Sequence, residues 1–338
     1  MNKSEVCRVE TALAYRGWHL LVLENRNLRV ALLPEKGSDI IEFRYKPLDL
    51  NIMWESPLGL RAKEWFVPTN SQGKEGNFMD YYQGGWQEIF PNTGPATDYK
   101  GTTIGQHGEV ALSPWTLQIL EETERRVSVK LEVKTYRTPF SLKKVLSIEG
   151  DEPSLYMEET VTNLAGERVE FSWGHHPAIG APFLSEKCLV NLPGTPQVEV
   201  FSGDGRSLTN LLPGKGTWPV VKGKNGEIDL RKVPSFQDKV STFILITSLL
   251  EGKYEITNPE KRLSFRMEWE TKVFSHLWYW LVAGGSFHYP WWGMTYNLAL
   301  EPMSGPPILS EALQKGKALS LEAGQSLTTK LSATFIPV

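Results

Sequence analysis

Cysteine is nearly absent from this sequence, and long apolar runs are missing altogether. The 338 residues include two cysteines, Cys7 and Cys188, whose separation matches no metal-binding or redox motif. So few cysteines favour a reducing compartment. No run reaches the roughly 18 apolar residues that a membrane-spanning helix needs, and Met1–Val30 lacks the apolar core of a signal peptide. We therefore expect a cytoplasmic protein that does not act at a membrane.

A strong excess of either charge is also missing. Lysine and arginine total 36 against 39 acidic residues, which gives a net charge of -3. Without a basic stretch or a charged tail, a nucleic-acid partner is not expected. The chain has no internal repeat, no low-complexity segment and no linker rich in Pro, Gly or Ser. We accordingly expect one domain over residues 1–338.

Helical periodicity is scarce, whereas period-two alternation is frequent. Val127, Val129, Leu131 and Val133 alternate with polar residues, as in a strand with one buried face. Only 308–315 has a helical pattern, with Gly316 as its C-terminal stop. Further short strand-like runs, bounded by turn residues, lie at 28–43 (a hairpin), 140–148, 155–163, 198–201, 243–247, 254–256, 263–269, 296–300 and 326–335. This pattern predicts an all-β fold, either a large antiparallel sandwich or a barrel.

Tryptophan is abundant, with 12 residues in the chain. That number indicates either a heavily aromatic core or flat surfaces on which a ligand stacks. The run 273–282 is almost wholly apolar and includes Trp278 and Trp280, which predicts a strand buried on both faces. Between Arg61 and Thr103 the strand pattern gives way to Gly, Pro, Asn and aromatic residues. A loop of this length inside a compact domain is often functional.

Two adjacent histidines, His175 and His176, follow the strand-like run Val169–Trp173. Pro177 and Gly180 come next, and we expect these two residues to end the strand. If the backbone stays extended through the pair, the two rings point to opposite faces, so at most one of them faces a given cleft. The alternative without a catalytic role is a buried, hydrogen-bonded histidine beside a surface one.

Two further places offer reactive groups. His107 is followed by Gly108 at the exit of the long loop, which leaves the imidazole open to approach. Glu301 ends the apolar run Leu298–Leu300 directly before Pro302. We expect a desolvated carboxylate there, with a raised pKa that suits a base near neutral pH; otherwise Glu301 is a strand-end residue that points to water. The histidine spacing matches no metal site, and we expect no metal and no other cofactor.

The order of these motifs resembles the aldose 1-epimerase, or galactose mutarotase-like, family. The resemblance covers the chain from about Val30 to Phe335 and depends on order and spacing more than on any single motif. It implies a large antiparallel β-sandwich of the galactose mutarotase-like supersandwich type. The matching segments are Lys36–Ile41, Ile52–Trp54, Glu88–Asn92, His107–Gly108, His176–Ala178, Glu301–Pro302 and Leu321–Ser326.

The same resemblance implies a mechanism. Glu301 would be the general base that takes the proton from the anomeric hydroxyl of an aldose. His176 would be the general acid that protonates the ring oxygen, and His107 would hydrogen-bond the ring or anomeric oxygen. The ring opens, the carbonyl carbon rotates, and closure from the other face gives the other anomer. The implied partner is a small-molecule sugar, and the oligomeric state is left open.

Departures from the family leave the substrate less defined than the fold. Many members carry an arginine after the Phe-Pro segment, where this chain has Asn92–Pro95. Sugar-phosphate relatives carry one after His-Gly, where it has Glu109–Leu112, which disfavours a phosphosugar. For each candidate that could contact the sugar there is an alternative without such contact: Arg61 would lie on the surface, and the candidate tryptophans would pack in the core. The candidate sugar-contacting residues are His175, Trp173, Asn92, Arg61 and Trp86, with Trp291 and Trp292 as further stacking candidates.

Three functions are therefore compatible with the sequence. The first is an isomerase that interconverts sugar anomers, and the joint presence of His107, His176 and Glu301 favours it. The second is a non-catalytic carbohydrate-binding or sensing protein on the same fold. The third is a carbohydrate lyase or hydrolase, which rests on fold analogy alone because no paired carboxylates are placed for glycoside cleavage.

Overall fold

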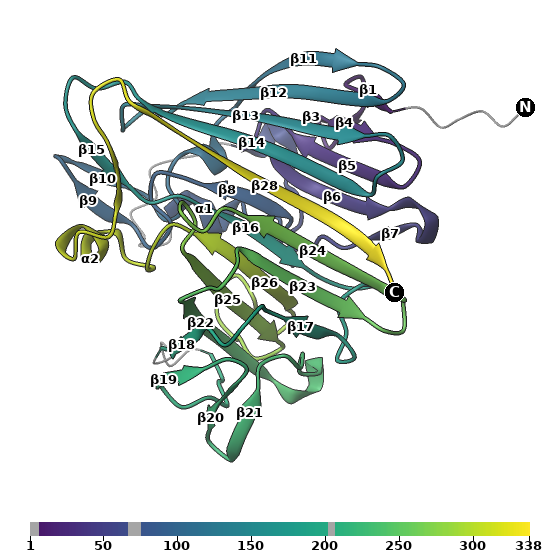
Figure 1. The fold of residues 1–338 in the computed structure, drawn as a ribbon, viewed down its shortest axis with the longest axis vertical. Helices are drawn as coiled ribbons and strands as arrows, with labels where there is room; N and C mark the ends of the chain where they lie inside the picture. The colour runs from purple at the N-terminus through teal and green to yellow at the C-terminus, as the bar shows by residue number, and fades with distance from the viewer. Residues whose placement is uncertain (1–6, 67–75, 202–206) are drawn as a thin grey trace, which may run out of the picture.

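Two large antiparallel sheets form most of the molecule, which confirms the predicted all-β fold (Figure 1). The computed structural model describes residues 7–66, 76–201 and 207–338; the part of the long loop at 67–75 lies outside these ranges. The larger sheet runs, in spatial order, β1 (Arg8–Glu10), β4 (Leu21–Glu24), β5 (Leu28–Leu33), β6 (Asp39–Tyr45), β8 (Trp86–Ile89), β16 (Gly174–Ile179), β26 (Tyr296–Met303), β25 (His276–Ala283), β22 (Val240–Thr247), β18 (Gln197–Val200), β19 (Gly214–Thr217), β20 (Val220–Gly223) and β21 (Gly226–Asp229), with β7 (Leu50–Asn51) beside β6.

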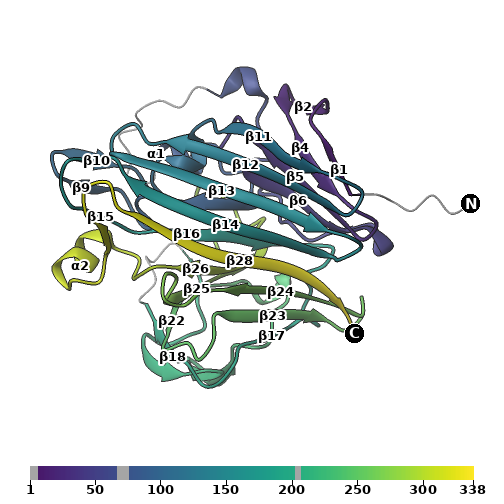
Figure 2. The same cartoon turned by 45° about the horizontal axis from the view of Figure 1, so that its top comes forward.

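The smaller sheet lies in front of the larger one in Figure 2. Its order is β11 (Thr116–Glu122), β12 (Arg126–Lys134), β13 (Phe140–Glu149), β14 (Ser154–Asn163), β28 (Ser326–Pro337), β24 (Leu263–Trp269), β23 (Lys253–Asn258) and β17 (Leu189–Asn191). Three two-stranded pairs complete the sheets: β2 (Ala14–Tyr15) with β3 (Trp18–His19), β9 (Thr97–Tyr99) with β10 (Thr102–Ile104), and β15 (Val169–Phe171) with β27 (Leu319–Leu321). The short helical elements are η1 (Lys46–Leu48), η2 (Lys63–Trp65), α1 (Gly76–Asp80), η3 (Val110–Leu112), η4 (Phe236–Asp238) and α2 (Leu309–Gln314).

Period-two alternation explains the smaller sheet. Val127, Val129, Leu131 and Val133 on β12 are all buried, and the residues between them are mostly more exposed. In the β12–β13 register Val127 lies opposite Ile148 and Val133 opposite Leu142. Cross-strand apolar pairs of this kind fix the register, because a one-residue slip would turn every buried side chain to solvent.

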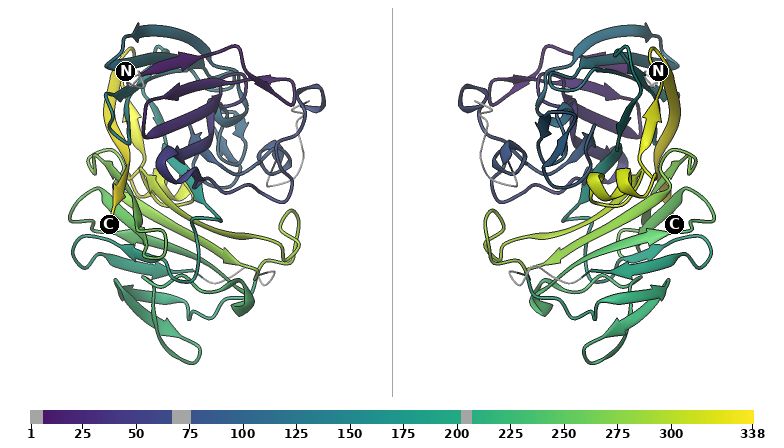
Figure 3. Two further views of the ribbon diagram at one scale, coloured as in Figure 1. Left: turned by 90° about the vertical axis from the view of Figure 1, so that its right-hand side faces the viewer. Right: turned by 90° about the vertical axis from the view of Figure 1, so that its left-hand side faces the viewer.

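The middle of the larger sheet is buried on both faces, as predicted for residues 273–282. On β25, Leu277, Tyr279 and Leu281 pack into the main core between the sheets. Trp278 and Trp280 alternate with them and belong to a second apolar cluster on the opposite face. The loop between β25 and β26 projects on the same side of the molecule as α1 (Figure 3). Tyr289 in that loop donates to Asp80 of α1 at 2.5 Å, and Trp291 and Phe78 from these two elements belong to the second cluster.

Two prolines lie inside strands, which corrects the sequence-based expectation. Pro177 was expected to end its strand, yet β16 continues to Ile179 between β8 and β26. Glu301 was expected at a strand end before Pro302, yet β26 runs on to Met303. The β16–β26 ladder is interrupted between the pairs Gly174–Met303 and Ala178–Ala299. Both prolines fall in that interval. Because β16 and β26 are not paired there, the missing N–H groups of the prolines cost no hydrogen bond between these two strands.

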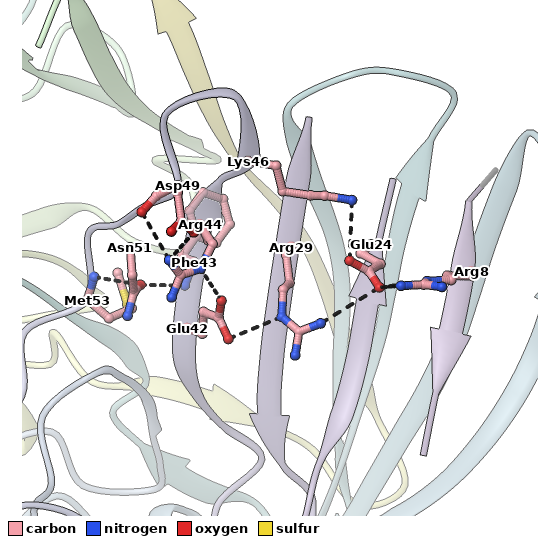
Figure 4. A network of polar contacts seen from close by, with 10 residues as sticks. All are labelled: Arg8, Glu24, Arg29, Glu42, Phe43, Arg44, Lys46, Asp49, Asn51 and Met53. Carbon is pink, nitrogen blue, oxygen red and sulfur yellow. Dashed lines mark hydrogen bonds and ion pairs between the residues drawn. The ribbon is translucent and has the colours of Figure 1, made fainter. Parts of the chain in front are cut away.

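Charged side chains link the N-terminal strands of the larger sheet (Figure 4). The carboxylate of Glu24 on β4 binds Arg8, Arg29 and Lys46, and Arg29 continues the chain to Glu42 on β6. Burial alone would raise the pKa of Glu24, but its three cationic partners outweigh burial and lower that pKa. This network holds the edge strand β1 and protects a sheet edge that lies away from the central strands.

The predicted helix is confirmed as α2, and Gly316 follows it with φ of 61°, a conformation that glycine adopts readily. Neither α1 nor α2, the α-helices within the described residues, has the length and apolar character that crossing a membrane requires.

Candidate active site

A cavity of about 310 Å³ lies on the second face of the larger sheet, over β16, β26 and β25. Its walls come from segments far apart in the sequence. His176 and Glu301 come from β16 and β26, His107 comes from the loop before η3, and Tyr82 follows α1. The three residues proposed as catalytic from the sequence therefore line one cavity, although they are separated by 69 and 125 positions in the chain.

The strand register brings His176 and Glu301 together. Gly174 pairs with Met303 and Ala178 with Ala299, so the midpoint of this interval places His176 opposite Glu301. Both side chains point to the same face because each lies two residues from a paired position. His176 Nε2 lies 3.5 Å from Glu301 Oε1, and both side chains are buried. This distance is slightly longer than a hydrogen bond, which is usual for catalytic pairs without bound substrate.

Burial disfavours charge on both members of this pair. Desolvation, with a smaller contribution from nearby His107, lowers the pKa of His176 to about 3. Desolvation raises the pKa of Glu301 well above its ordinary value. Above about pH 3 and below the raised pKa of Glu301, the imidazole is then uncharged and the pair carries one proton, on the carboxyl group. A carboxyl and an imidazole that share one proton in a dry cavity can exchange it with a bound substrate.

His107 is held by the loop that carries it. Its Nδ1 lies 2.6 Å from the carbonyl oxygen of Thr93. Because a carbonyl only accepts, Nδ1 bears the proton, and Nε2 is left as an acceptor in the neutral ring. Burial lowers the pKa of His107 to about 4, which keeps the ring neutral. The next residue, Gly108, has φ of 79°, and a Cβ there would lie 2.1 Å from the Phe90 carbonyl oxygen, so only glycine fits.

Tyr82 is a site residue that the sequence analysis missed. Its hydroxyl lies 3.2 Å from His176 Nδ1, on the side of the ring away from Glu301. Burial, followed by the nearby Glu301 and Asp39 carboxylates, raises its pKa well above the ordinary value, so the phenol stays protonated. The tyrosine is in the loop between α1 and β8, where the sequence carries no regular pattern that could place it.

Aromatic rings form most of the remaining wall. Trp280 lies 5.6 Å from His176 between ring centroids, and Trp291 lies 5.3 Å from Trp280. Phe78 contacts His107 edge-on at 4.5 Å. Gln106 also lines the cavity, and its buried Oε1 has no hydrogen-bond partner in the structure. Such an acceptor is costly unless a ligand or water satisfies it. The wall therefore combines flat apolar faces with one unsatisfied polar group, as in many small-molecule sites.

None of the five residues expected to contact the sugar lines the cavity, and three of them, His175, Trp173 and Trp86, are buried elsewhere. His175 alternates with His176 and faces the interior between the two sheets, where Trp86 Nε1 donates to its Nδ1 at 3.1 Å and Glu159 binds its Nε2 at 2.9 Å. Trp173 is fully buried and donates to Glu88 at 3.0 Å. The structure does not bring these three residues to the cavity, because period-two alternation sends His175 and Trp86 to the inner face, where their ring nitrogens are hydrogen-bonded.

Asn92 and Arg61 support the site from outside it. The Asn92 side-chain nitrogen donates to the carbonyl oxygens of Gly94, Pro95 and Gly105, at 3.2, 2.7 and 3.0 Å. It thereby ties together the two loop segments that form one wall. Arg61 donates to the Asp80 carbonyl at 2.8 Å and does not line the cavity. Of the stacking candidates, Trp291 lines the cavity, whereas Trp292 is 57% exposed.

Residues 15–212 match the family model described as a domain of unknown function, DUF4432. That match spans more than half of the chain. The chain belongs to the DUF4432 family. The part of this DUF4432 chain that matches includes His107 and His176, whereas Glu301 lies beyond it. A comparison with curated proteins gives no significant match.

Solved structures resemble this DUF4432 chain at low sequence identity. A candidate aldose 1-epimerase from Klebsiella pneumoniae aligns with a TM-score of 0.74 and 12% identity, over 97% of this chain and 83% of that protein. The Slr1438 protein from Synechocystis aligns with a TM-score of 0.65 and 19% identity, over 97% and 100%. A galactose mutarotase-like protein from Clostridium acetobutylicum aligns with a TM-score of 0.64 and 12% identity, over 98% and 99%. These likenesses confirm the galactose mutarotase-like fold.

The donor set of the cavity suits acid–base chemistry. Over the described ranges, no group of three or more His, Cys, Asp or Glu side chains has an arrangement suited to a metal ion. What the cavity does hold is an imidazole and a carboxyl with opposed pKa shifts, a neutral second imidazole and a protonated phenol. Such a set can move a proton between two oxygens of one substrate.

Proposed function

We propose that this protein is a carbohydrate isomerase that interconverts the anomers of a neutral aldose by opening and closing its ring. The observation that carries the proposal is the buried His176–Glu301 pair, 3.5 Å apart, on the floor of an aromatic-walled cavity. Anomer interconversion needs one group that takes a proton from O1 and one that gives a proton to the ring oxygen. A pair that shares one proton can supply both.

In the proposed step the shared proton first passes from Glu301 to His176 Nε2, which leaves a carboxylate opposite an imidazolium. The carboxylate of Glu301 takes the proton of the anomeric hydroxyl as the C1–O1 double bond forms. The bond between C1 and the ring oxygen breaks, and the ring oxygen takes the proton of His176. The open-chain aldehyde rotates about its C1–C2 bond, and the reverse transfers close the ring on the other face. Each transfer is worth roughly 10²- to 10⁴-fold in rate.

Tyr82 and His107 complete the proposed assignment. The Tyr82 hydroxyl can accept a hydrogen bond from His176 Nδ1–H, and that arrangement leaves Nε2 of the neutral ring unprotonated, so Nε2 can receive the shared proton from Glu301. His107 presents Nε2 as an acceptor, because Nδ1 is bound to Thr93. It can therefore accept a hydrogen bond from a sugar hydroxyl and orient the ring over the pair.

The cavity wall supports a neutral substrate. Among the described residues that line it, Glu301 is the one acidic side chain, and none is a lysine or arginine. A phosphate or carboxylate on the sugar would bring negative charge into a buried space without a cation to pair with it. The flat faces of Trp280 and Trp291 instead suit the apolar face of an uncharged pyranose ring.

The direct test is the rate at which wild-type protein changes the optical rotation of freshly dissolved aldoses. We expect acceleration of at least one hexose or pentose above its spontaneous rate, with no loss after treatment with a chelator. Heat-denatured protein is the control. If no aldose is accelerated while calorimetry detects binding of a sugar, the protein is a carbohydrate-binding or sensing protein, and the proposal is wrong.

A further inference from the structure

A second cavity, of about 260 Å³, adjoins the candidate active site. The two cavities share Phe243, Trp280 and Trp291 as lining residues. Trp280 packs against His176 at a ring-centroid distance of 5.6 Å, so one indole separates the reacting groups from the second cavity. The two cavities are therefore adjacent, and a ligand longer than the first cavity would reach the second along the shared side chains.

Hydroxyl groups line this second cavity. Ser286 Oγ donates to Ser241 Oγ at 3.0 Å, and Ser207 Oγ lies 3.0 Å from Ser286 Oγ. A hydroxyl has one proton, so Ser207 donates to Ser286 and the proton of Ser241 is directed elsewhere. Thr209 Oγ1 accepts from the Leu211 amide at 3.2 Å and keeps its own proton for another acceptor. The chain of hydroxyls thus offers at least two donors to a ligand in the cavity.

Apolar rings and neutral side chains complete the wall. Phe201 and Phe243 lie 5.8 Å apart with an interplanar angle of 32°. Among the described lining residues of this cavity, none is Lys, Arg, Asp or Glu. His288 is a further lining residue of the described wall. Flat rings and hydroxyl donors suit an uncharged polyhydroxylated ring, and the described lining residues offer no lysine or arginine to a phosphate or a uronic acid.

We propose that this second cavity is a subsite for a further glycosyl unit, so that the substrate is a neutral reducing disaccharide or longer saccharide. This proposal rests on the proposed function. The reducing-end ring would lie over His176 and Glu301, and the next ring, joined through a hydroxyl other than O1, would lie against Trp280, Phe243 and the serine chain. A single aldose would fill the first cavity and leave the second to water.

The test compares kcat/KM for maltose, cellobiose and lactose with kcat/KM for glucose and galactose, by polarimetry with correction for the spontaneous reaction. We expect at least one disaccharide to exceed both monosaccharides by about tenfold or more, a factor ordinary for one additional well-filled pocket. Thr209→Trp, which fills the second cavity, should reduce that ratio to about one. Ser286→Ala should reduce it less, because it removes the central hydroxyl but no volume.

Leu208→Trp is the matched control, since Leu208 neighbours Thr209 but is 54% exposed and does not line the cavity. It should leave the ratio unchanged. Equal kcat/KM for mono- and disaccharides, or a ratio that survives Thr209→Trp in folded protein, would overturn the subsite while the isomerase proposal stands. If no sugar is turned over, the proposed function fails, and calorimetry with maltose, cellobiose and lactose decides the subsite: binding that Thr209→Trp abolishes supports it, and no binding overturns it.

Discussion

His176 and Glu301 face each other across neighbouring antiparallel strands, with Nε2 and Oε1 3.5 Å apart in a buried cavity. The chain reaches this arrangement from positions 125 residues apart, so the sheet register and not local sequence sets the distance. Burial lowers the pKa of His176 and raises the pKa of Glu301, because a dry site penalises the charged form of each group. Each group thereby becomes a partner that can receive or release the one shared proton.

Glu301→Gln should reduce the rate of anomer interconversion by about 10²- to 10⁴-fold while sugar binding persists. Glutamine keeps the shape and an acceptor oxygen, but it cannot take a proton near neutral pH. His176→Asn should lose a similar factor, and the double variant should lose little more than either one, because both groups act in a single step. Rates come from polarimetry and binding from calorimetry.

The matched control is Glu268→Gln, an exposed glutamate on β24 of the other sheet, which should keep the wild-type rate. Additive losses in the double variant would mean that His176 and Glu301 act in separate steps. Most of the rate surviving in Glu301→Gln would remove Glu301 from the mechanism.

Tyr82→Phe should lower kcat by about tenfold and leave KM nearly unchanged. Phenylalanine preserves the ring packing against Phe78, at 5.1 Å between centroids, but removes the hydroxyl that lies 3.2 Å from His176 Nδ1. The His176 tautomer is then no longer fixed, and part of the population carries its proton on the wrong nitrogen. Nitrogen chemical shifts of the His176 ring would report this redistribution, which a merely structural change would not produce.

Tyr254→Phe is the control, since Tyr254 is equally buried but its hydroxyl contacts the Met267 sulfur in the core. It should change neither kcat nor the His176 shifts. An unchanged tautomer in Tyr82→Phe, with unchanged kcat, would contradict the positioning role.

The pH dependence should follow the single proton of the His176–Glu301 pair. As pH falls toward about 3, His176 also becomes protonated, and no base is left. As pH rises through the raised pKa of Glu301, the pair loses its proton, and no acid is left. We therefore expect a rate plateau that begins above about pH 3 and ends in a decline on the alkaline side, well above the ordinary carboxyl pKa. The rate of anomer interconversion at each pH is measured by exchange NMR on an isotope-labelled sugar, which needs no indicator dye.

If Glu301→Gln keeps a measurable rate, the pH profile of that rate should show no alkaline decline, because glutamine does not titrate. A wild-type rate that instead rises as pH increases through the carboxyl titration would show that a free carboxylate, without the shared proton, is the active form.

Alternation predicted the sheets and predicted that His175 and His176 point to opposite faces, whereas the choice of His176 for the cleft came from the family resemblance. The same period of two implied that His175 points elsewhere, and it does, toward Glu159. Trp86 and Trp173 could not be sorted in the same way, because a strand with both faces buried gives no polar side to mark the direction of the cavity. Their partners, His175 and Glu88, are likewise fixed by packing between the two sheets.

Tyr82 and the second cavity lay beyond sequence reasoning for a different reason. Tyr82 reaches His176 from a loop 94 residues away, and loop positions depend on tertiary contacts such as that between Tyr289 and Asp80. Pro177 and Pro302 misled the strand boundaries, since proline usually ends a central strand. Here the two prolines coincide with an interruption of the ladder, a compensation that a single strand cannot reveal.

Gly174→Ala should weaken both stability and turnover, because this glycine sets how closely β16 approaches β26 two residues before His176. A Cβ at Gly174 would lie 2.8 Å from the Pro302 carbonyl oxygen and 2.0 Å from Met303 Sδ. The sulfur can move, but the carbonyl belongs to the residue after Glu301, so β26 must shift. We expect a loss of about 1–3 kcal/mol in unfolding free energy by urea titration and a lower kcat. Gly166→Ala, whose Cβ would meet nothing within 4 Å, should change neither. Full stability with full turnover in Gly174→Ala would show that strand separation does not set the distance between His176 and Glu301.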